Sequence, residues 1–169
     1  MADELRIHSR PELERPVLIA AFRGWNDGAQ AASLAAGYLA KTWGAEQFAE
    51  IDPEDFFDFQ ATRPHVTLED GLTRRIEWPE TGFYHARPEG LDRDIVLLLG
   101  IEPNLRWRTF TELVIGLASE LEVELMITLG ALLADVPTRA RPRSRAARPT
   151  TSSSSGSGCP PRATKGRRE

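Results

Sequence analysis

Cysteine, long apolar runs and a secretory signal are all missing from this sequence. Cys159 is the only cysteine in 169 residues, so neither a disulfide framework nor a cysteine metal site is available. No run approaches the roughly 18 apolar residues of a membrane-spanning helix. The charged start, MADELRIHSRPELERP, lacks the apolar segment of a secretory signal. We therefore expect a cytoplasmic protein with no membrane partner.

The motifs of several common enzyme classes are missing as well. The turn GWNDG at residues 24–28 lacks the G-x-G-x-x-G pattern that cradles a dinucleotide, and neither a P-loop nor a G-x-S-x-G serine elbow occurs. His8, His65 and His85 are scattered without metal-ligand spacing, so we interpret them as ordinary surface histidines. The sequence thus predicts no metal, no cofactor and no catalytic residue.

Positive charge is concentrated at the C-terminal end. Residues 138–169 hold nine Lys or Arg and one acid, which gives them +8; because the whole chain totals −4, residues 1–137 carry −12. A basic arm on an acidic body is typical of nucleic-acid or membrane-surface binding, and salt-dependent RNA binding is one hypothesis for it. The Pro, Ser, Gly and Arg content of this tail also predicts disordered chain.

Three short apolar runs are typical of strands buried on both faces of a parallel sheet: PVLIAAF (16–22), RDIVLLLG (93–100) and ELMITLGALLAD (124–135). Helical spacing follows the first two runs. Asp27 can cap a helix that ends near Leu39 or Lys41, before Gly44. The second helix has an apolar stripe along 110–121. The order strand, helix, strand, helix, strand predicts a three-layer α/β/α sandwich with a mostly parallel sheet.

Two further segments complete the expected organisation. AEQFAEID (45–52) is the next strand after the first helix, and a right-handed crossover of this kind predicts a parallel pair. DGLTRRIEWPETGFYHAR (70–87) predicts two exposed antiparallel strands joined near residues 79–82. Because these two strands are polar, we expect them at an edge of the main sheet or outside it.

Candidate functional residues lie on the loops that leave the buried strands. In open α/β sheets, ligands meet the carboxyl ends of the strands, so a cluster there could hold a small polar ligand. The polar residues on these loops are Arg23, Asn26, Asp27, Glu102, Asn104, Arg106 and Asp135. The structural alternative is that Asp27 is only a helix cap, Asn26 serves a turn, and Gly24 and Gly28 supply positive φ angles.

Two tryptophans on the same loops have two interpretations. Trp25 and Trp107 are exposed anchors for a partner protein, or they close the top of the core, which is the use we expect. Asp27 and Glu102 would form a general acid–base pair only if the two carboxylates are close and their pKa values are shifted.

Four motifs, in this order and spacing, resemble the proteasome assembly chaperone 2 family, particularly its actinobacterial members. They are PVLIAAFRGWNDGAQAAS, DFFDFQATRP, DIVLLLGIEPNLRW and LGALLADVP, and the resemblance covers residues 5 to 137. The residues that match its two turns are Gly24, Trp25, Asn26 and Asp27, with Glu102, Pro103, Arg106 and Trp107.

The resemblance implies a nucleoside-phosphorylase-like α/β/α fold and a protein-binding function. Eukaryotic members of the family help to assemble proteasome α-subunit rings, and bacterial members form homo-oligomers. We therefore expect protein partners, proteasome subunits or further copies of the chain among them, rather than nucleic acid. The alternative is an enzyme on the phosphorylase-like scaffold that uses Asp27 and Glu102 on a nucleoside or carboxylate ligand.

The resemblance stops abruptly after Pro137. Family members continue with His-Thr-Arg-Pro and a long second half. Read one base earlier, the codons of residues 138–169 permit that continuation. We therefore predict a frameshift near Pro137. Residues 1–137 would be the first part of the domain, incomplete on its C-terminal side, and 138–169 an out-of-frame tail. An uncovered strand at 124–129 would favour aggregation and put the function of this copy in doubt.

Overall fold

The computed structural model describes residues 4–135 of the chain. The predicted tail, 138–169, lies outside these residues. The strands and helices that follow one another along the chain are β1 (Leu5–Ile7), β2 (Val17–Arg23), the 3₁₀ turn η1 (Gly28–Gln30), α1 (Ala31–Thr42), β3 (Glu46–Ile51), β4 (His65–Glu69), β5 (Thr73–Glu77), β6 (Thr81–Ala86), β7 (Ile95–Ile101), α2 (Trp107–Glu120) and β8 (Leu125–Leu129). Within the described part, no helix is long and apolar enough to cross a membrane.

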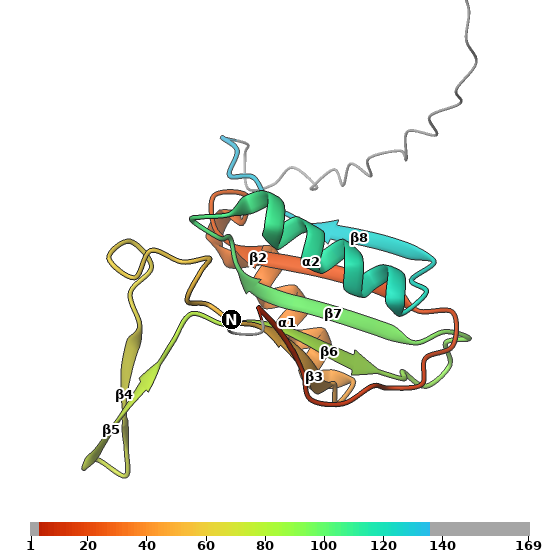
Figure 1. The fold of residues 1–169 in the computed structure, drawn as a ribbon, viewed down its shortest axis with the longest axis horizontal. Coiled ribbons are helices and arrows are strands. Elements are labelled where there is room, and N and C mark those ends of the chain that lie inside the picture. The colour runs from red at the N-terminus through yellow and green to blue at the C-terminus, as the bar shows by residue number, and fades with distance from the viewer. Residues whose placement is uncertain (1–3, 136–169) are drawn as a thin grey trace, which may run out of the picture. The chain divides into compact units, whose positions relative to one another are not determined.

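Six of the strands form one sheet in the order β1-β3-β6-β7-β2-β8. Strands β7, β2 and β8 pair in parallel, with Arg23 opposite Ile101 and Ala21 opposite Leu129. The other neighbours pair antiparallel, so β2, β3, β7 and β8 run in one direction while β1 and β6 run in the other (Figure 1). The apolar runs 16–22, 93–100 and 124–135 thus form the parallel part of the sheet, as predicted.

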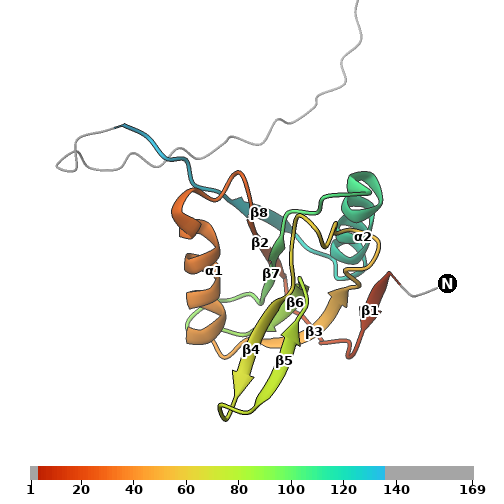
Figure 2. The ribbon, with the colours of Figure 1, turned by 90° about the vertical axis from the view of Figure 1, so that its left-hand side faces the viewer.

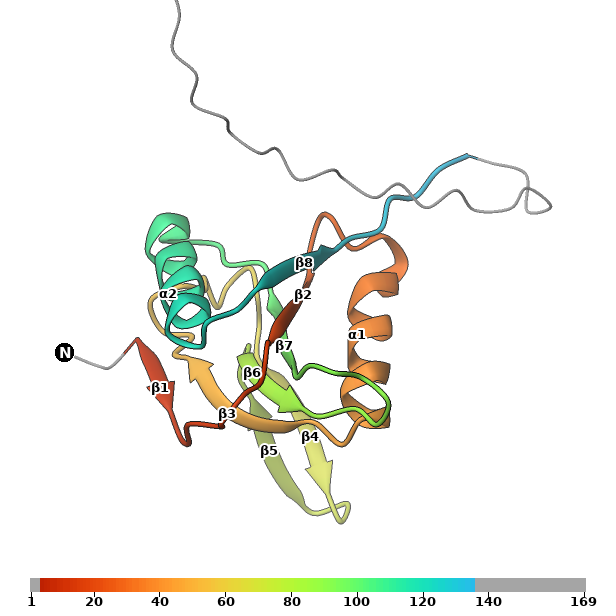
Figure 3. The same cartoon turned by 90° about the vertical axis from the view of Figure 1, so that its right-hand side faces the viewer.

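The helices cover opposite faces of the sheet, which confirms the predicted three-layer α/β/α arrangement (Figures 2 and 3). Alternate residues of a strand point to opposite faces. Leu18 and Leu98 pack with Phe110 on the α2 side, whereas Val17 and Leu97 pack with the C-terminal end of α1 on the other.

The larger core lies between α2 and the sheet. Phe110 sits at its centre, 5% exposed, with the ring of Phe56 at 5.5 Å and that of Phe22 at 5.9 Å, both edge-on. Each edge-to-face pair stabilises the fold by about 0.5–1.5 kcal/mol beyond its burial. This core fixes the start of α2 and therefore the loop that precedes it.

Two predictions about the arrangement of strands in the sheet are wrong. β6 lies inside the main sheet between β3 and β7, and its residue Phe83 is fully buried. Strand β3 therefore pairs with β6, not with β2, although β3 and β2 point the same way. The crossover through α1 passes over two strands before the chain re-enters the sheet, so the strands it joins are not neighbours.

Strand β5 pairs with β4, not with β6, so the hairpin predicted within residues 70–87 does not form. β4 and β5 make a separate two-stranded sheet with its turn at residues 70–72 (Figure 1), and only the position of β5 outside the main sheet agrees with the prediction. Every residue of both strands is exposed. One face carries Val66 opposite Ile76, and the other carries an ion pair between Arg75 and Glu69 at 3.0 Å.

Candidate functional site

The loops that leave β2, β7 and β8 meet at one edge of the sheet, as parallel strands require. The N–H of Glu102 donates to the carbonyl of Arg23 at 2.9 Å. The N–H of Ala131 donates to the carbonyl of Asn26 at 2.8 Å, and that of Gly28 donates back to Ala131 at the same distance. The structure therefore brings the predicted exit-loop residues together through their backbones. We call this edge the exit face.

Glu102 connects the β7 exit loop to the β2 exit loop through its side chain. Its Oε2 accepts a hydrogen bond from the N–H of Trp25 at 3.0 Å. A Cβ at Gly24 would collide with the Glu102 carboxylate, so a side chain there would require Glu102 to move. Neither Gly24 nor Gly28 has a positive φ, so that expectation is wrong. Lack of space, not backbone conformation, makes both positions suit glycine.

Asp27 is buried before the 3₁₀ turn η1, and its side chain caps the first turn of α1, although the N-cap position of that helix is Gln30. Its side chain accepts hydrogen bonds from the N–H of Ala32 at 2.7 Å, from the N–H of Ser33 at 3.4 Å and from the Ser33 hydroxyl. The Ser33 hydroxyl bond is the main cause that holds the pKa of Asp27 below its usual range, since it favours the charged carboxylate. Asp27 and Glu102 thus each accept hydrogen bonds from backbone groups, an arrangement that positions the loops.

Asn104 and Arg106 connect the β7 exit loop to the segment before the hairpin. Asn104 Oδ1 accepts from the N–H of Asp58 at 3.0 Å and from the hydroxyl of Thr62 at 2.9 Å. Arg106 pairs with Glu4 at 2.6 Å and with Asp55 at 3.1 Å. Both residues therefore position loops of their own chain. Asp135, the last predicted polar residue, is exposed.

The two exit-face tryptophans point to solvent. Trp25 is 88% exposed and Trp107 is 55% exposed, so the expectation that they close the core is wrong. Leu132 and Leu133, next to the Ala131 bridge, are about as exposed as Trp25. Pro103 is buried beneath the turn. We call Trp25, Trp107, Leu132 and Leu133 the exit-face patch.

Two cavities open beside this patch. One, of about 240 Å³, is mainly apolar and lies between α2 and the sheet, lined in part by Phe22, Trp107 and Met126. The other, of about 370 Å³, is lined in part by Arg23, Glu102 and Trp107. The side-chain oxygen of Asn26 is buried without a hydrogen-bond partner among the described residues.

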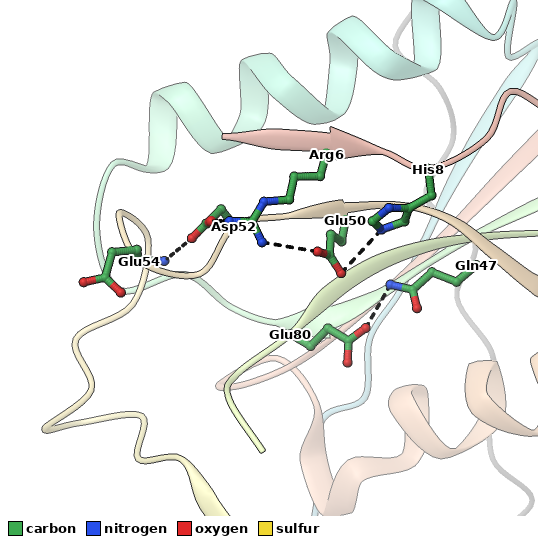
Figure 4. A network of polar contacts seen from close by, with 7 residues as sticks. All are labelled: Arg6, His8, Gln47, Glu50, Asp52, Glu54 and Glu80. Atoms are coloured by element: carbon green, nitrogen blue, oxygen red, sulfur yellow. Dashed lines mark hydrogen bonds and ion pairs between the residues drawn. The ribbon is translucent and has the colours of Figure 1, made fainter. Parts of the chain in front are cut away.

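The edge strand β1 is held to β3 by a surface polar network (Figure 4). Arg6 contacts Asp52 and lies 3.5 Å from Glu50, and His8 lies 3.7 Å from the same glutamate. Exposed pairs of this kind contribute about 0–1 kcal/mol each. In residues 4–135, no group of three or more His, Cys, Asp or Glu side chains is placed to hold a metal ion. We therefore assign this network a structural role.

A second group of residues lies near the exit face, although the sequence did not indicate it. Arg63, His65, Arg75 and Trp78 line a cavity together with Arg23. Only Arg23 was expected near the exit face, because the others belong to the hairpin or its flanks, whose direction the sequence does not indicate. The alternation of Arg75 with Ile76 and Trp78 was visible, but it gave no information about what the arginine faces.

The α/β/α sandwich and its two exit turns define an α/β domain of the kind that the motif resemblance implies. The PAC2 family model matches residues 21–158. The chain therefore belongs to the PAC2 family, the proteasome assembly chaperone 2 family that its motifs resemble. The matched range continues past Pro137, and the predicted frameshift stays a prediction.

Three solved structures are similar to this chain. A PAC2 family protein from Streptomyces avermitilis is 49% identical with a TM-score of 0.67, over 72% of this chain and 52% of that one. A proteasome-assembly chaperone homologue from Mycobacterium tuberculosis is 47% identical with the same TM-score, over 72% and 51%. An M. tuberculosis protein of unknown function is 28% identical with a TM-score of 0.74, over 83% and 51%.

The chain spans about half the length of these solved structures. No curated protein matches it. The similarity therefore establishes the family of the chain and the fold of residues 4–135.

Proposed function

We propose that the chain is a cytoplasmic protein-binding factor of the assembly-chaperone type, and that proteasome subunits are its partners. Family membership supports the chaperone class, and a similar protein from M. tuberculosis is a proteasome-assembly chaperone homologue. The observation that carries the proposal is the exit-face patch, where large apolar side chains are presented to solvent by loops fixed to the sheet.

The patch has the properties of a protein-docking surface. Trp25 and Leu132 are the chain neighbours of Asn26 and Ala131, which are hydrogen-bonded to each other, so the patch stands on a rigid base. Tryptophans supply much of the binding energy of protein interfaces when a partner covers them. In the free chain both Trp25 and Trp107 are uncovered. A partner that buries them gains the free energy of removing both rings from water.

The experiment is a binding measurement between the purified chain and purified actinobacterial proteasome α-subunits. We expect binding by the unaltered chain and a loss of about 30-fold or more in the double variant Trp25→Ala/Trp107→Ala. Trp78→Ala is a matched control, because Trp78 is 54% exposed, like Trp107, and lies outside the patch. Equal losses in the control and the double variant would contradict the proposal, as would no binding by the unaltered chain.

A further inference from the structure

An arginine-lined cavity lies between the exit face and the β4–β5 hairpin. It has a volume of about 850 Å³, and Arg23, Arg63, His65, Arg75 and Trp78 contribute to its wall. Small-molecule sites commonly measure about 300–1,000 Å³. We propose that this cavity binds a small oxyanion ligand, one that carries phosphate or carboxylate groups. The proposal is independent of the exit-face patch, since neither Trp25 nor Trp107 lines the cavity.

The place of the cavity in the fold suits a ligand. Arg23 is the last residue of β2 and Ile101 the last of β7, and these two residues are paired neighbours that both line the cavity. The cavity therefore lies at the carboxyl ends of two parallel strands, where ligands of open α/β sheets bind. The hairpin and the loop at 61–63 close it from the other side.

The charges in the wall favour an anion. Three arginines and two acids, Glu77 and Glu80, line the wall and give it a formal charge of +1, although Arg75 also pairs with Glu69 beside the cavity. This sign is opposite to the −12 carried by residues 1–137. Because the negative body repels anions, an anionic ligand can bind this surface only where the local charge is positive.

Two of the three arginines in the wall are free to bind a ligand, whereas Arg75 is paired with Glu69 at 3.0 Å. Arg23 and Arg63 form no ion pair within residues 4–135. The two acids have other partners. Glu77 accepts a hydrogen bond from the Thr67 hydroxyl at 3.1 Å, and Glu80 accepts one from the Gln47 amide at 2.9 Å (Figure 4).

The chemistry of the wall defines the ligand class. A guanidinium group donates two parallel hydrogen bonds to a carboxylate or a phosphate, and these charge-assisted bonds are about twice as strong as neutral ones. Trp78 adds a flat aromatic wall, held by the ring of Phe59 at 5.0 Å in an edge-on contact. A small molecule with two anionic groups satisfies Arg23 and Arg63 together and packs its remaining atoms on Trp78.

Titration calorimetry on the full chain at low ionic strength tests the site with two probes, pyrophosphate and citrate. We expect at least one of them to bind, and the stronger of the two shows whether phosphate or carboxylate is preferred. Arg23→Gln and Arg63→Gln should each weaken that binding by about 10-fold. Arg108→Gln is the matched control, because Arg108 is an exposed arginine on α2 that does not line the cavity.

Three calorimetric results would overturn the proposal: no binding of either probe at millimolar concentration, no loss of affinity in Arg23→Gln and Arg63→Gln, or an equal loss in Arg108→Gln. Arg63 is exposed on a loop, so its variant keeps the test valid if Arg23→Gln does not fold. Tryptophan fluorescence locates the anion. A ligand-induced change that disappears in Trp78→Phe supports the cavity, whereas one that disappears only in Trp107→Phe places the anion in the neighbouring cavity and contradicts the proposal.

Discussion

The carboxylate of Glu102 accepts a hydrogen bond at 3.0 Å from the backbone N–H of Trp25, 77 residues earlier in the chain. This bond joins the exit loops of β2 and β7 and passes over Gly24, where a side chain would collide with it. It thereby holds the most exposed tryptophan of the exit-face patch at a fixed place relative to the sheet.

Gly24→Ala should act by displacing Glu102. Because a Cβ at Gly24 would collide with the Glu102 carboxylate, we expect Gly24→Ala and Glu102→Ala each to lower the free energy of unfolding by about 1 kcal/mol. The double variant should lose less than the two together, since both remove the same bond. Urea unfolding measures all three. Gly37→Ala is the control, because a Cβ there meets open space, and additive losses would contradict the prediction.

Asp27→Ala should destabilise the start of α1. The substitution leaves the N–H groups of Ala32 and Ser33 without their acceptor, and we expect the melting temperature to fall by about 5 °C. Asp27→Asn keeps an acceptor oxygen, so its melting temperature should fall less. Circular dichroism melting curves compare the two. If Asp27→Ala melts like the unaltered chain, the capping role is wrong.

Asp94 makes the fold sensitive to acid. Arg87 donates two hydrogen bonds of 2.6 Å to this buried carboxylate, and the backbone N–H of Glu14 donates a third to it at 2.7 Å. The Arg87 bonds hold the pKa of Asp94 below its usual range. A lowered pKa stabilises the folded chain above the unfolded value of about 3.9, and this stability is lost as the pH falls through the folded value.

The Asp94→Asn variant tests whether Asp94 causes this loss of stability at low pH. We expect it to lose about 2 kcal/mol of unfolding free energy at pH 7 and to show a smaller further loss between pH 5 and pH 3 than the unaltered chain. Urea titrations at several pH values measure both. If the free energy of unfolding falls equally with pH in the two proteins, another group causes the acid sensitivity.

Ile127→Lys should reduce self-association. In the described part of the chain β8 pairs only with β2, and its outer edge carries Leu125, 50% exposed, and Ile127, 39% exposed. An apolar edge strand is a template for association, and a lysine there blocks it. Light scattering at increasing concentration measures the effect. Ile76→Lys, on the hairpin, is the control; if it reduces association as much, the β8 edge is not responsible.

The predicted change of reading frame near Pro137 is open to direct inspection. We expect the DNA around this codon to differ by a one-base insertion or deletion from a frame that encodes His-Thr-Arg-Pro after the proline. Sequencing of the locus in several isolates checks this. An intact frame that encodes the Arg- and Ser-rich residues 138–169 in all of them would contradict it.

Much of the fold was predictable because its signals are local. The strands β2, β7 and β8 are continuous apolar runs, and α2 repeats Phe110, Val114 and Leu117 at helical spacing. The convergence of the exit loops then followed from the parallel direction of these strands. The place of β6 was not predictable, since its segment, TGFYHA, is only partly apolar. Its burial comes from pairing with β7, the next strand along the chain, and also with β3, from which the β4–β5 hairpin separates it.

The features of the candidate sites likewise fall into those that the sequence predicts and those that it does not. The sequence by itself determined that Asp27 caps a helix and that Arg23 and Glu102 stand at strand exits, because these features depend on neighbouring residues and strand direction. Only the tertiary structure decided that Trp25 and Trp107 face solvent, and that Arg63 and Arg75 share a cavity with Arg23. Those outcomes depend on how the hairpin and helices pack on the sheet, a balance of contacts between segments that are far apart in the chain.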